Sequence, residues 1–136
     1  MKIVFLAFLL LVSSAPFAEA HKAATSKDAE LNTPALKAII DSGVSVVLLD
    51  ARPDKFAEGK RLPGAKYLSD SASSETVAKA IPSKKSLVVV YCGGMECPLS
   101  VELAHHLKSL GYPNVIEYRE GIEGWTKAGY PTDPVR

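Results

Sequence analysis

The most informative segment of the sequence runs from residue 86 to residue 94 and reads Ser86-Leu87-Val88-Val89-Val90-Tyr91-Cys92-Gly93-Gly94. Its apolar, β-branched part is typical of a strand that is buried on both faces of a sheet. A cysteine follows the strand directly, and two glycines open the connection to the next apolar pattern. The segment therefore predicts a strand over 86–91, a loop over 92–99 and a helix over 100–110.

Apolar runs and helical patterns alternate along the rest of the chain. An N-cap at Asn32 or Thr33, with Pro34 in the first turn, begins a helix that Gly43 ends. Further strands are expected over 44–50, 65–68 and 114–118, and further helical turns over 53–60, 74–81 and 121–128. This alternation predicts an α/β fold in which a mostly parallel sheet has helices on both faces. We assign it to one small domain over residues 30–136.

Length, composition and charge exclude several classes of protein. The 136 residues suffice for one domain, and their formal net charge is +1. The chain has no block of basic residues, so we expect neither a nucleic-acid partner nor binding to an anionic membrane. Charged residues make up 23% of the chain, and the ample supply of Val, Leu and Ile excludes a disordered protein. A domain of this size folds without disulfides, so its two cysteines are not needed as a structural framework.

The first twenty residues resemble a secretory signal peptide. Lys2 precedes ten consecutive apolar residues over 3–12, and Ala18-Glu19-Ala20 fits the small-x-small cleavage pattern. A membrane span needs about 20 apolar residues, so this run is too short to be an anchor. We therefore expect cleavage before His21, a flexible segment over 21–29 and no membrane attachment after cleavage. The mature protein is expected to be exported, with the bacterial periplasm as the expected compartment.

Cys92 is the first candidate for chemistry. In open α/β sheets ligands bind at the carboxyl ends of the strands, where Cys92 is expected to lie. Gly93 and Gly94 allow successive backbone amides to converge on one point, and convergent amides bind anions. Around a thiol they stabilise the thiolate, which is the nucleophilic form. The alternative is that Cys92 is only a small buried apolar residue at the end of a strand.

Four blocks of the sequence, in order, resemble the single-domain rhodaneses, a family of sulfurtransferases. Residues 46–52 resemble the family's strand ending in Asp-x-Arg. Residues 59–65 resemble its Gly-His-Ile-Pro-Gly-Ala segment, with one extra residue and no histidine. The remaining blocks are the cysteine strand and helix over 89–112, and residues 114–125, where Glu120 replaces the first glycine of a Gly-Gly pair. The resemblance covers nearly all of residues 30–132.

This resemblance implies persulfide chemistry without a metal or an organic cofactor. Cys92 attacks the outer sulfur of a donor, which is thiosulfate or a persulfide, and it passes that sulfur to a thiol or cyanide. The loop after Cys92 then binds the substrate anion, as an oxyanion hole does. We assign to this loop Gly93, Gly94, Met95, Glu96 and Ser100, with Met95 as an apolar lip.

The loop departs from the family pattern in its charge and length. Seven residues, 93–99, separate Cys92 from Ser100, which is more than in typical members. If Cys97 capped the helix and Pro98 took its first position, the loop from Cys92 to Cys97 would have the usual length. None of residues 93–99 is basic, and Glu96 opposes both a thiolate and a dianion such as thiosulfate. Arginine-dependent relatives, the phosphatases and arsenate reductases, are therefore disfavoured.

Cys97 has two interpretations. It can be a resolving thiol that attacks a Cys92 persulfide, releases hydrosulfide and leaves a Cys92–Cys97 disulfide. Alternatively it can be a buried helix cap, or half of a static disulfide that clamps the loop. The spacing permits the separation of about 4.4–6.8 Å between Cα atoms that a disulfide needs. We favour the redox role, because an exported protein works where thiols are oxidised.

Other polar residues have weaker functional signals. Asp50 and Arg52 belong to the same sheet edge as Cys92, so they either line the pocket or form a structural hydrogen-bonded pair. Lys60 and Arg61 are candidates for the positive charge that the loop lacks. His105 and His106 are adjacent on a helix and point about 100° apart, so we expect no metal site there.

Three classes of function follow from these features. The first is an exported sulfurtransferase that acts through a Cys92 persulfide. The second is a thiol–disulfide protein that uses Cys92 and Cys97 to exchange electrons with a redox partner. The third is a non-catalytic binding module on a rhodanese scaffold. The strand–cysteine–glycine arrangement favours the first class, whereas the lack of a basic loop residue favours the other two.

Overall fold

The computed structural model describes residues 30–135. The expected signal peptide over 1–20, its cleavage site and the segment over 21–29 lie outside the described residues. Among the described residues, no helix has the length and apolar character needed to span a membrane.

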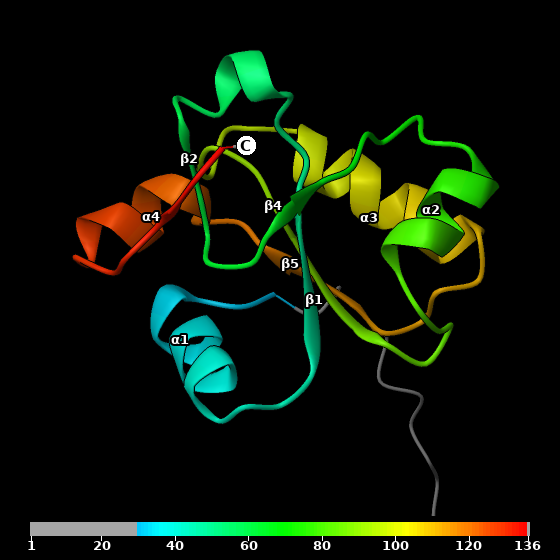
Figure 1. Ribbon diagram of the computed structural model, residues 1–136, viewed down its shortest axis with the longest axis horizontal. Coiled ribbons are helices and arrows are strands. Elements are labelled where there is room, and N and C mark those ends of the chain that lie inside the picture. Colours follow the sequence, from blue (N-terminus) through cyan, green and yellow to red (C-terminus); the bar gives the residue numbers. More distant parts are fainter. Residues whose placement is uncertain (1–29, 136) are drawn as a thin grey trace, which may run out of the picture.

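A parallel sheet of four strands forms the centre of the fold (Figure 1), in the order β3-β1-β4-β5. Its strands are β1 (Val46–Asp50), β3 (Lys66–Tyr67), β4 (Leu87–Tyr91) and β5 (Val115–Tyr118). In the register of β1 and β4, Leu49 lies opposite Val90 and Asp50 opposite Tyr91. The predicted parallel α/β architecture is therefore confirmed, and β4 lies between two neighbouring strands.

Helices cover both faces of the sheet, as predicted (Figure 1). Side chains of α2 (Ser74–Ala80) and α3 (Leu99–Ser109) belong to one apolar cluster, whereas those of α1 (Thr33–Asp41) and α4 (Gly121–Lys127) belong to the other. Val88 and Val90 of β4 face the first cluster, while Val89 and Tyr91 face the second. All four side chains are fully buried. Burial of an aliphatic side chain of this kind contributes about 1.5–3 kcal/mol, so β4 is a main source of stability.

Local sequence signals account for the start of α1. The side chain of Asn32 accepts a 2.9 Å hydrogen bond from the amide of Ala35, and Pro34 lies in the first turn. The helix ends before Gly43, which has a φ of +72°. Asn32 is therefore the N-cap, and the predicted boundaries are confirmed.

Two local predictions need correction. The helix α3 begins at Leu99 with Pro98 as its N-cap residue, so Cys97 does not cap it. Only the beginning of the turn expected over 53–60 is helical, in the short 3-10 helix η1 (Asp54–Phe56). Lys60 and Arg61 instead form the strand β2.

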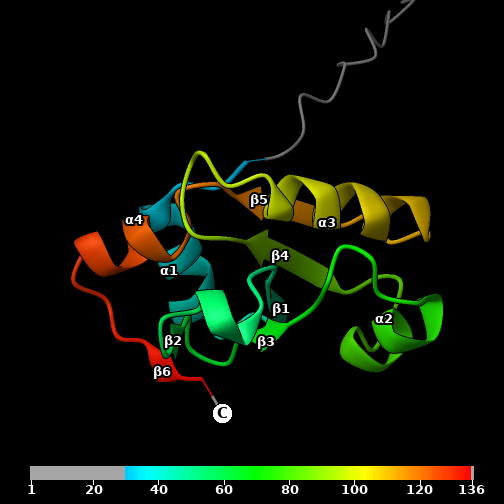
Figure 2. The ribbon, with the colours of Figure 1, turned by 90° about the horizontal axis from the view of Figure 1, so that it is seen from above.

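A second, two-stranded sheet was not predicted. It pairs β2 (Lys60–Arg61) with β6 (Asp133–Pro134) in antiparallel fashion, so the C-terminal segment lies beside the loop that follows β1 (Figure 2). The side chain of Asp133 also accepts a 2.8 Å hydrogen bond from the amide of Gly64. This sheet fixes Arg61 close to the carboxyl end of β1.

Candidate functional site

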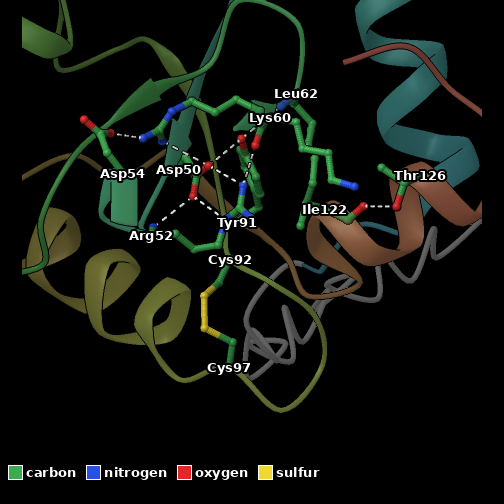
Figure 3. A network of polar contacts seen from close by, with 11 residues as sticks. Asp50, Arg52, Asp54, Lys60, Leu62, Tyr91, Cys92, Cys97, Ile122 and Thr126 are labelled. Atoms are coloured by element: carbon green, nitrogen blue, oxygen red, sulfur yellow. Dashed lines mark hydrogen bonds and ion pairs between the residues drawn. A yellow bond between two sulfur atoms is a disulfide. The ribbon is translucent and has the colours of Figure 1, made fainter. Parts of the chain in front are cut away.

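The two cysteines lie in the loop between β4 and α3 and form a disulfide with each other (Figure 3). Cys92 follows the last residue of β4, and its exposed fraction is 1%. The Cα atoms of Cys92 and Cys97 are 6.1 Å apart, within the range typical of disulfides. The loop therefore brings together the two residues that the sequence indicated for chemistry.

Helix α4 holds the backbone of this loop in place. The amides of Ile122 and Glu123 donate hydrogen bonds of 3.0 and 2.9 Å to the carbonyls of Cys92 and Gly93. These donors belong to the first turn of α4, where amides have no partner within the helix. The start of α4 thus binds the cysteine loop of its own chain.

Two further hydrogen bonds fix the middle of the loop. The side chain of Arg119, which follows β5, donates a 2.7 Å bond to the carbonyl of Met95. Within the loop, the amide of Cys97 donates a 3.0 Å bond to the carbonyl of Gly94. Arg119 is therefore a basic residue at the loop, although its side chain is bound to a backbone carbonyl.

Gly121 is required where α4 meets the loop. Its φ is +59°, a conformation that residues with a Cβ rarely adopt. A Cβ at this position would lie 2.5 Å from the carbonyl oxygen of Cys92 and 2.7 Å from the carbonyl carbon of Gly93. A larger residue would therefore separate α4 from the loop.

A cavity of about 860 Å³ lies between the loop and α4. Its lining comprises Gly93, Gly94, Met95, Glu96, Cys97, Glu120, Glu123, Gly124, Lys127 and Ala128. Three of these residues are glutamates and one is a lysine, so the lining has an excess of negative charge. Cys97 borders the cavity, whereas Cys92 is not among the lining residues.

Glu120 differs from the other glutamates because its carboxylate is bound. It accepts a 2.9 Å hydrogen bond from the amide of Thr33 and a second bond from the Thr33 hydroxyl. Oγ1 of Thr33 also lies 2.6 Å from the hydroxyl oxygen of Tyr118. Glu120 therefore connects the start of α4 to the start of α1.

Asp50 is the centre of a buried polar network beneath the loop (Figure 3). Its carboxylate accepts hydrogen bonds from the backbone amide, Nε and Nη2 of Arg52, at 2.9, 3.0 and 2.7 Å. The hydroxyl of Tyr91 donates a third side-chain bond at 3.0 Å, and Nη1 of Arg61 lies 3.0 Å from the same oxygen. The network thus joins β1 to β2 and to the residue that precedes Cys92.

The network shifts the pKa values of Tyr91 and Arg52. Burial raises the pKa of the Tyr91 hydroxyl above its ordinary value, and the negative charge of Asp50 raises it further. Burial alone would lower the pKa of Arg52, but its hydrogen bonds and ion pair with Asp50 outweigh this effect and raise that pKa. Tyr91 therefore remains a hydrogen-bond donor and Arg52 remains a cation.

The structure separates the predicted site residues into two groups. Residues 93–97 line the cavity, and Met95 is 51% exposed at its edge. Asp50, Arg52 and Arg61 are buried in the network, and Ser100 is buried in α3. None of these four is among the residues that line the cavity.

Neither Lys60 nor Arg61 supplies the positive charge that the sequence indicated at the loop. Arg61 forms ion pairs with Asp50 and Asp54, at 3.0 and 2.5 Å, and Lys60 belongs to β2 rather than to the cavity lining. The basic residues beside the loop are Arg119 and Lys127, which the sequence reasoning missed. Their place in the sequence could have indicated them, because residues 119–127 directly follow β5, the strand that pairs with β4.

The histidine pair has no role at the loop. His105 is exposed, and Nε2 of His106 lies 2.7 Å from the carbonyl oxygen of Ala72. Within residues 30–135, no group of three or more His, Cys, Asp or Glu side chains is placed to hold a metal ion.

The fold and the cysteine loop define an α/β domain of the rhodanese class. The model of the rhodanese-like domain family matches residues 32–128, well over half of the chain. The chain therefore belongs to the rhodanese-like family, with a single such domain. No curated protein sequence matches it.

Solved structures agree with this assignment. A protein from Bacillus halodurans has a TM-score of 0.70 and 24% identity, over 78% of this chain and 77% of that one. A rhodanese-like domain from Anabaena sp. has a TM-score of 0.65 and 22% identity, over 79% and 80%. These two likenesses show the fold.

One similar structure is named for an activity. It is a thiosulfate sulfurtransferase from Pseudomonas aeruginosa, with a TM-score of 0.62 and 27% identity. The match covers 78% of this chain but only 20% of that larger protein. The resemblance to a protein named as a sulfurtransferase is therefore distant.

Proposed function

We propose that the protein is a sulfurtransferase in which Cys92 holds sulfur as a persulfide and Cys97 resolves it. The observation that supports this most directly is the Cys92–Cys97 disulfide across the loop that follows β4. Family membership and the distant likeness to a thiosulfate sulfurtransferase support the choice of sulfur as the transferred atom.

The first step loads sulfur onto the reduced enzyme. The Cys92 thiolate attacks the outer sulfur of thiosulfate, the S–S bond of thiosulfate breaks, and sulfite leaves with the electron pair of that bond. The product is a persulfide anion on Cys92. Another persulfide donor reacts in the same way and releases its own thiolate.

The second step removes the sulfur. The persulfide takes up a proton, the Cys97 thiolate attacks Sγ of Cys92, the S–S bond of the persulfide breaks, and hydrosulfide leaves with the electron pair of that bond as the Cys92–Cys97 disulfide forms. The backbone that separates the two Cα atoms by 6.1 Å keeps Cys97 close enough for this attack. An external thiol or cyanide competes by attacking the outer sulfur instead, and it leaves the Cys92 thiolate.

The disulfide also supports a second candidate, a thiol–disulfide redox protein without a sulfur-transfer step. Both functions use the reduced and the oxidised forms of the cysteine pair, but only sulfur transfer forms a persulfide. Intact-mass spectrometry distinguishes them when the reduced protein is treated with thiosulfate in the absence of oxygen. Sulfur transfer predicts release of sulfite and a species about 32 Da heavier, which Cys92→Ser abolishes. In the wild type this species should then give way to loss of about 2 Da and release of hydrosulfide, whereas it should persist in Cys97→Ala.

A different result would contradict the proposal. No change of mass with thiosulfate, followed by loss of about 2 Da when a disulfide oxidant such as oxidised glutathione is added, would indicate the redox protein. No change of mass with thiosulfate, with a persulfide donor or with the disulfide oxidant would leave a binding module.

We also propose that the protein is exported and works in an oxidising compartment such as the bacterial periplasm. The pattern of residues 1–20 supports export. A disulfide in the loop is compatible with such a compartment, because cytosolic reductants keep most thiols reduced. The cycle then requires a dedicated thiol reductant.

A further inference from the structure

The two cysteines of the disulfide differ in their exposure. Cys92 is 1% exposed and does not line the cavity, whereas Cys97 is half-buried and borders the cavity beside α4. A thiolate that reduces a disulfide must reach one sulfur atom, and the reaction depends on which sulfur is accessible. Only Cys97 offers an approach from the cavity.

The charges around this approach are mainly negative. Glu96 and Glu123 are exposed at the cavity, and no hydrogen bond or ion pair joins their carboxylates to another residue of the described chain. Glu120 adds a third carboxylate, although Thr33 binds it, and Lys127 supplies the single positive charge of the lining. Arg119, beside the loop but outside the lining, donates its hydrogen bond to the carbonyl of Met95. Such a lining repels anionic thiols and attracts cationic ones.

The size of the cavity indicates more than a small thiol. A volume of about 860 Å³ lies in the upper part of the range of pockets for drug-sized ligands, and it exceeds what a small thiol fills. The exposed side chain of Met95 offers an apolar contact at its edge, and methionine adapts to varied partners.

We propose, as an extension of the proposed function, that the disulfide is reduced through Cys97 by a cysteine flanked by basic residues in a partner protein. The partner thiolate attacks Sγ of Cys97, the Cys92–Cys97 bond breaks, and Cys92 leaves as a thiolate. A second thiolate of the partner then attacks the sulfur of the partner cysteine that is bonded to Cys97, so that the mixed disulfide breaks and Cys97 leaves as a thiolate. The partner loses two electrons and becomes a disulfide, while the enzyme regains both thiols.

The test uses the oxidised full chain and three peptides of equal length. Their single cysteine is flanked on both sides by Lys, by Gln or by Glu. Release of the Cys92 thiol is followed at low salt, and each rate constant is divided by the thiolate fraction of the peptide. We expect the Lys peptide to react roughly tenfold faster than the Glu peptide, with the Gln peptide between them. The difference should shrink in high salt.

Two matched variants locate the effect. The double variant Glu96→Gln with Glu123→Gln should bring the three rates together, whereas Glu75→Gln, an exposed change on α2, should leave them apart. The salt dependence of the wild-type protein gives an independent readout if the double variant folds poorly. Cysteamine, a small cationic thiol, distinguishes a peptide partner from a small molecule, because the Lys peptide should react faster per thiolate.

Peptide mapping identifies the sulfur that is attacked. The mixed disulfide is trapped with acid, and we expect the peptide on Cys97. A peptide on Cys92, equal rates for the three peptides, or a faster reaction of the Glu peptide would each overturn the proposal. If cysteamine reacted as fast as the Lys peptide, this would overturn the claim that the reductant is a protein. The assay contains no sulfur donor, so its outcome is independent of whether Cys92 accepts sulfur.

Discussion

The amide of Ile122 donates a 3.0 Å hydrogen bond to the carbonyl oxygen of Cys92. This bond, with the neighbouring one from Glu123 to Gly93, joins the first turn of α4 to the residue that holds sulfur in the proposed reaction. The position of the nucleophile therefore depends on a segment about thirty residues further along the chain.

Substitution of Gly121 tests this dependence. In Gly121→Ala the new Cβ meets the carbonyl of Cys92 at 2.5 Å, in a backbone conformation with positive φ. Gly129→Ala is the matched control, because Gly129 also has a positive φ but has open space around a Cβ. We expect Gly121→Ala to lower the free energy of unfolding by about 1–3 kcal/mol more than Gly129→Ala, as measured in urea. Equal losses of unfolding free energy in the two variants would contradict a close contact between α4 and the loop that contributes to stability.

Substitution of Asp50 tests the network beneath the loop. Asp50→Asn leaves Arg52 buried without its counter-charge and removes one of the two ion pairs of Arg61, and breaking a buried pair typically costs about 3–5 kcal/mol. Asp54→Asn removes an ion pair with Arg61 from an aspartate whose side chain is 66% exposed, so its cost should be below about 1 kcal/mol. Unfolding in urea measures both, and similar losses would contradict a structural role centred on Asp50.

Much of the fold was predictable because its signals are local. The apolar run ending at Asp50 and the run over 87–91 are strands in the structure, and Asn32 caps α1 as its position indicated. The strand β6 has no such signal, since it consists of Asp133 and Pro134 and forms only through its pairing with β2.

The site was predictable only in part. Cys92 and Cys97 are close in sequence, so their pairing needed little knowledge of the fold. The contributions of Arg119 and Glu123 depend on β5 lying beside β4. This strand order is a long-range feature that no local pattern of the sequence indicates. The burial of Arg61 likewise results from long-range contacts, and it removes a charge that the sequence had offered to the loop.

Glu96→Arg should improve the use of thiosulfate. The change removes a negative charge from the cavity lining and adds a bidentate donor for a dianion. We expect the KM for thiosulfate to fall by about threefold or more at low salt. Glu75→Arg on α2 is the control and should leave KM unchanged. A KM that stays constant or rises in Glu96→Arg would show that residue 96 does not face the bound donor.

Export can be tested on the protein made by its natural host or by a bacterial host with a secretion pathway. The pattern Ala18-Glu19-Ala20 after the apolar run predicts that the mature chain begins at His21. N-terminal sequencing of protein from the periplasmic fraction measures this directly. A chain that begins at Met1 and stays with the cytoplasmic fraction would contradict the proposed location.

The role of Cys97 is the central claim, and the variant Cys97→Ala isolates it. The proposed resolving step needs this thiol, so the variant should still accept sulfur at Cys92 but should keep the persulfide. In the wild-type protein the neighbouring thiol acts at an effective concentration in the millimolar range or above, and it outcompetes dilute external thiols. Wild type should therefore release one hydrosulfide and stop as the disulfide until a reductant is added.

The most direct measurement is the lifetime of the Cys92 persulfide in the two proteins. Reduced protein is loaded with a stoichiometric amount of thiosulfate without oxygen, the persulfide is trapped with an alkylating agent at successive times, and the sulfur per chain is counted by mass spectrometry. Our account predicts a persulfide that disappears from the wild type as the disulfide forms and that persists in Cys97→Ala. Equal lifetimes in the two proteins would remove Cys97 from the reaction and contradict the account.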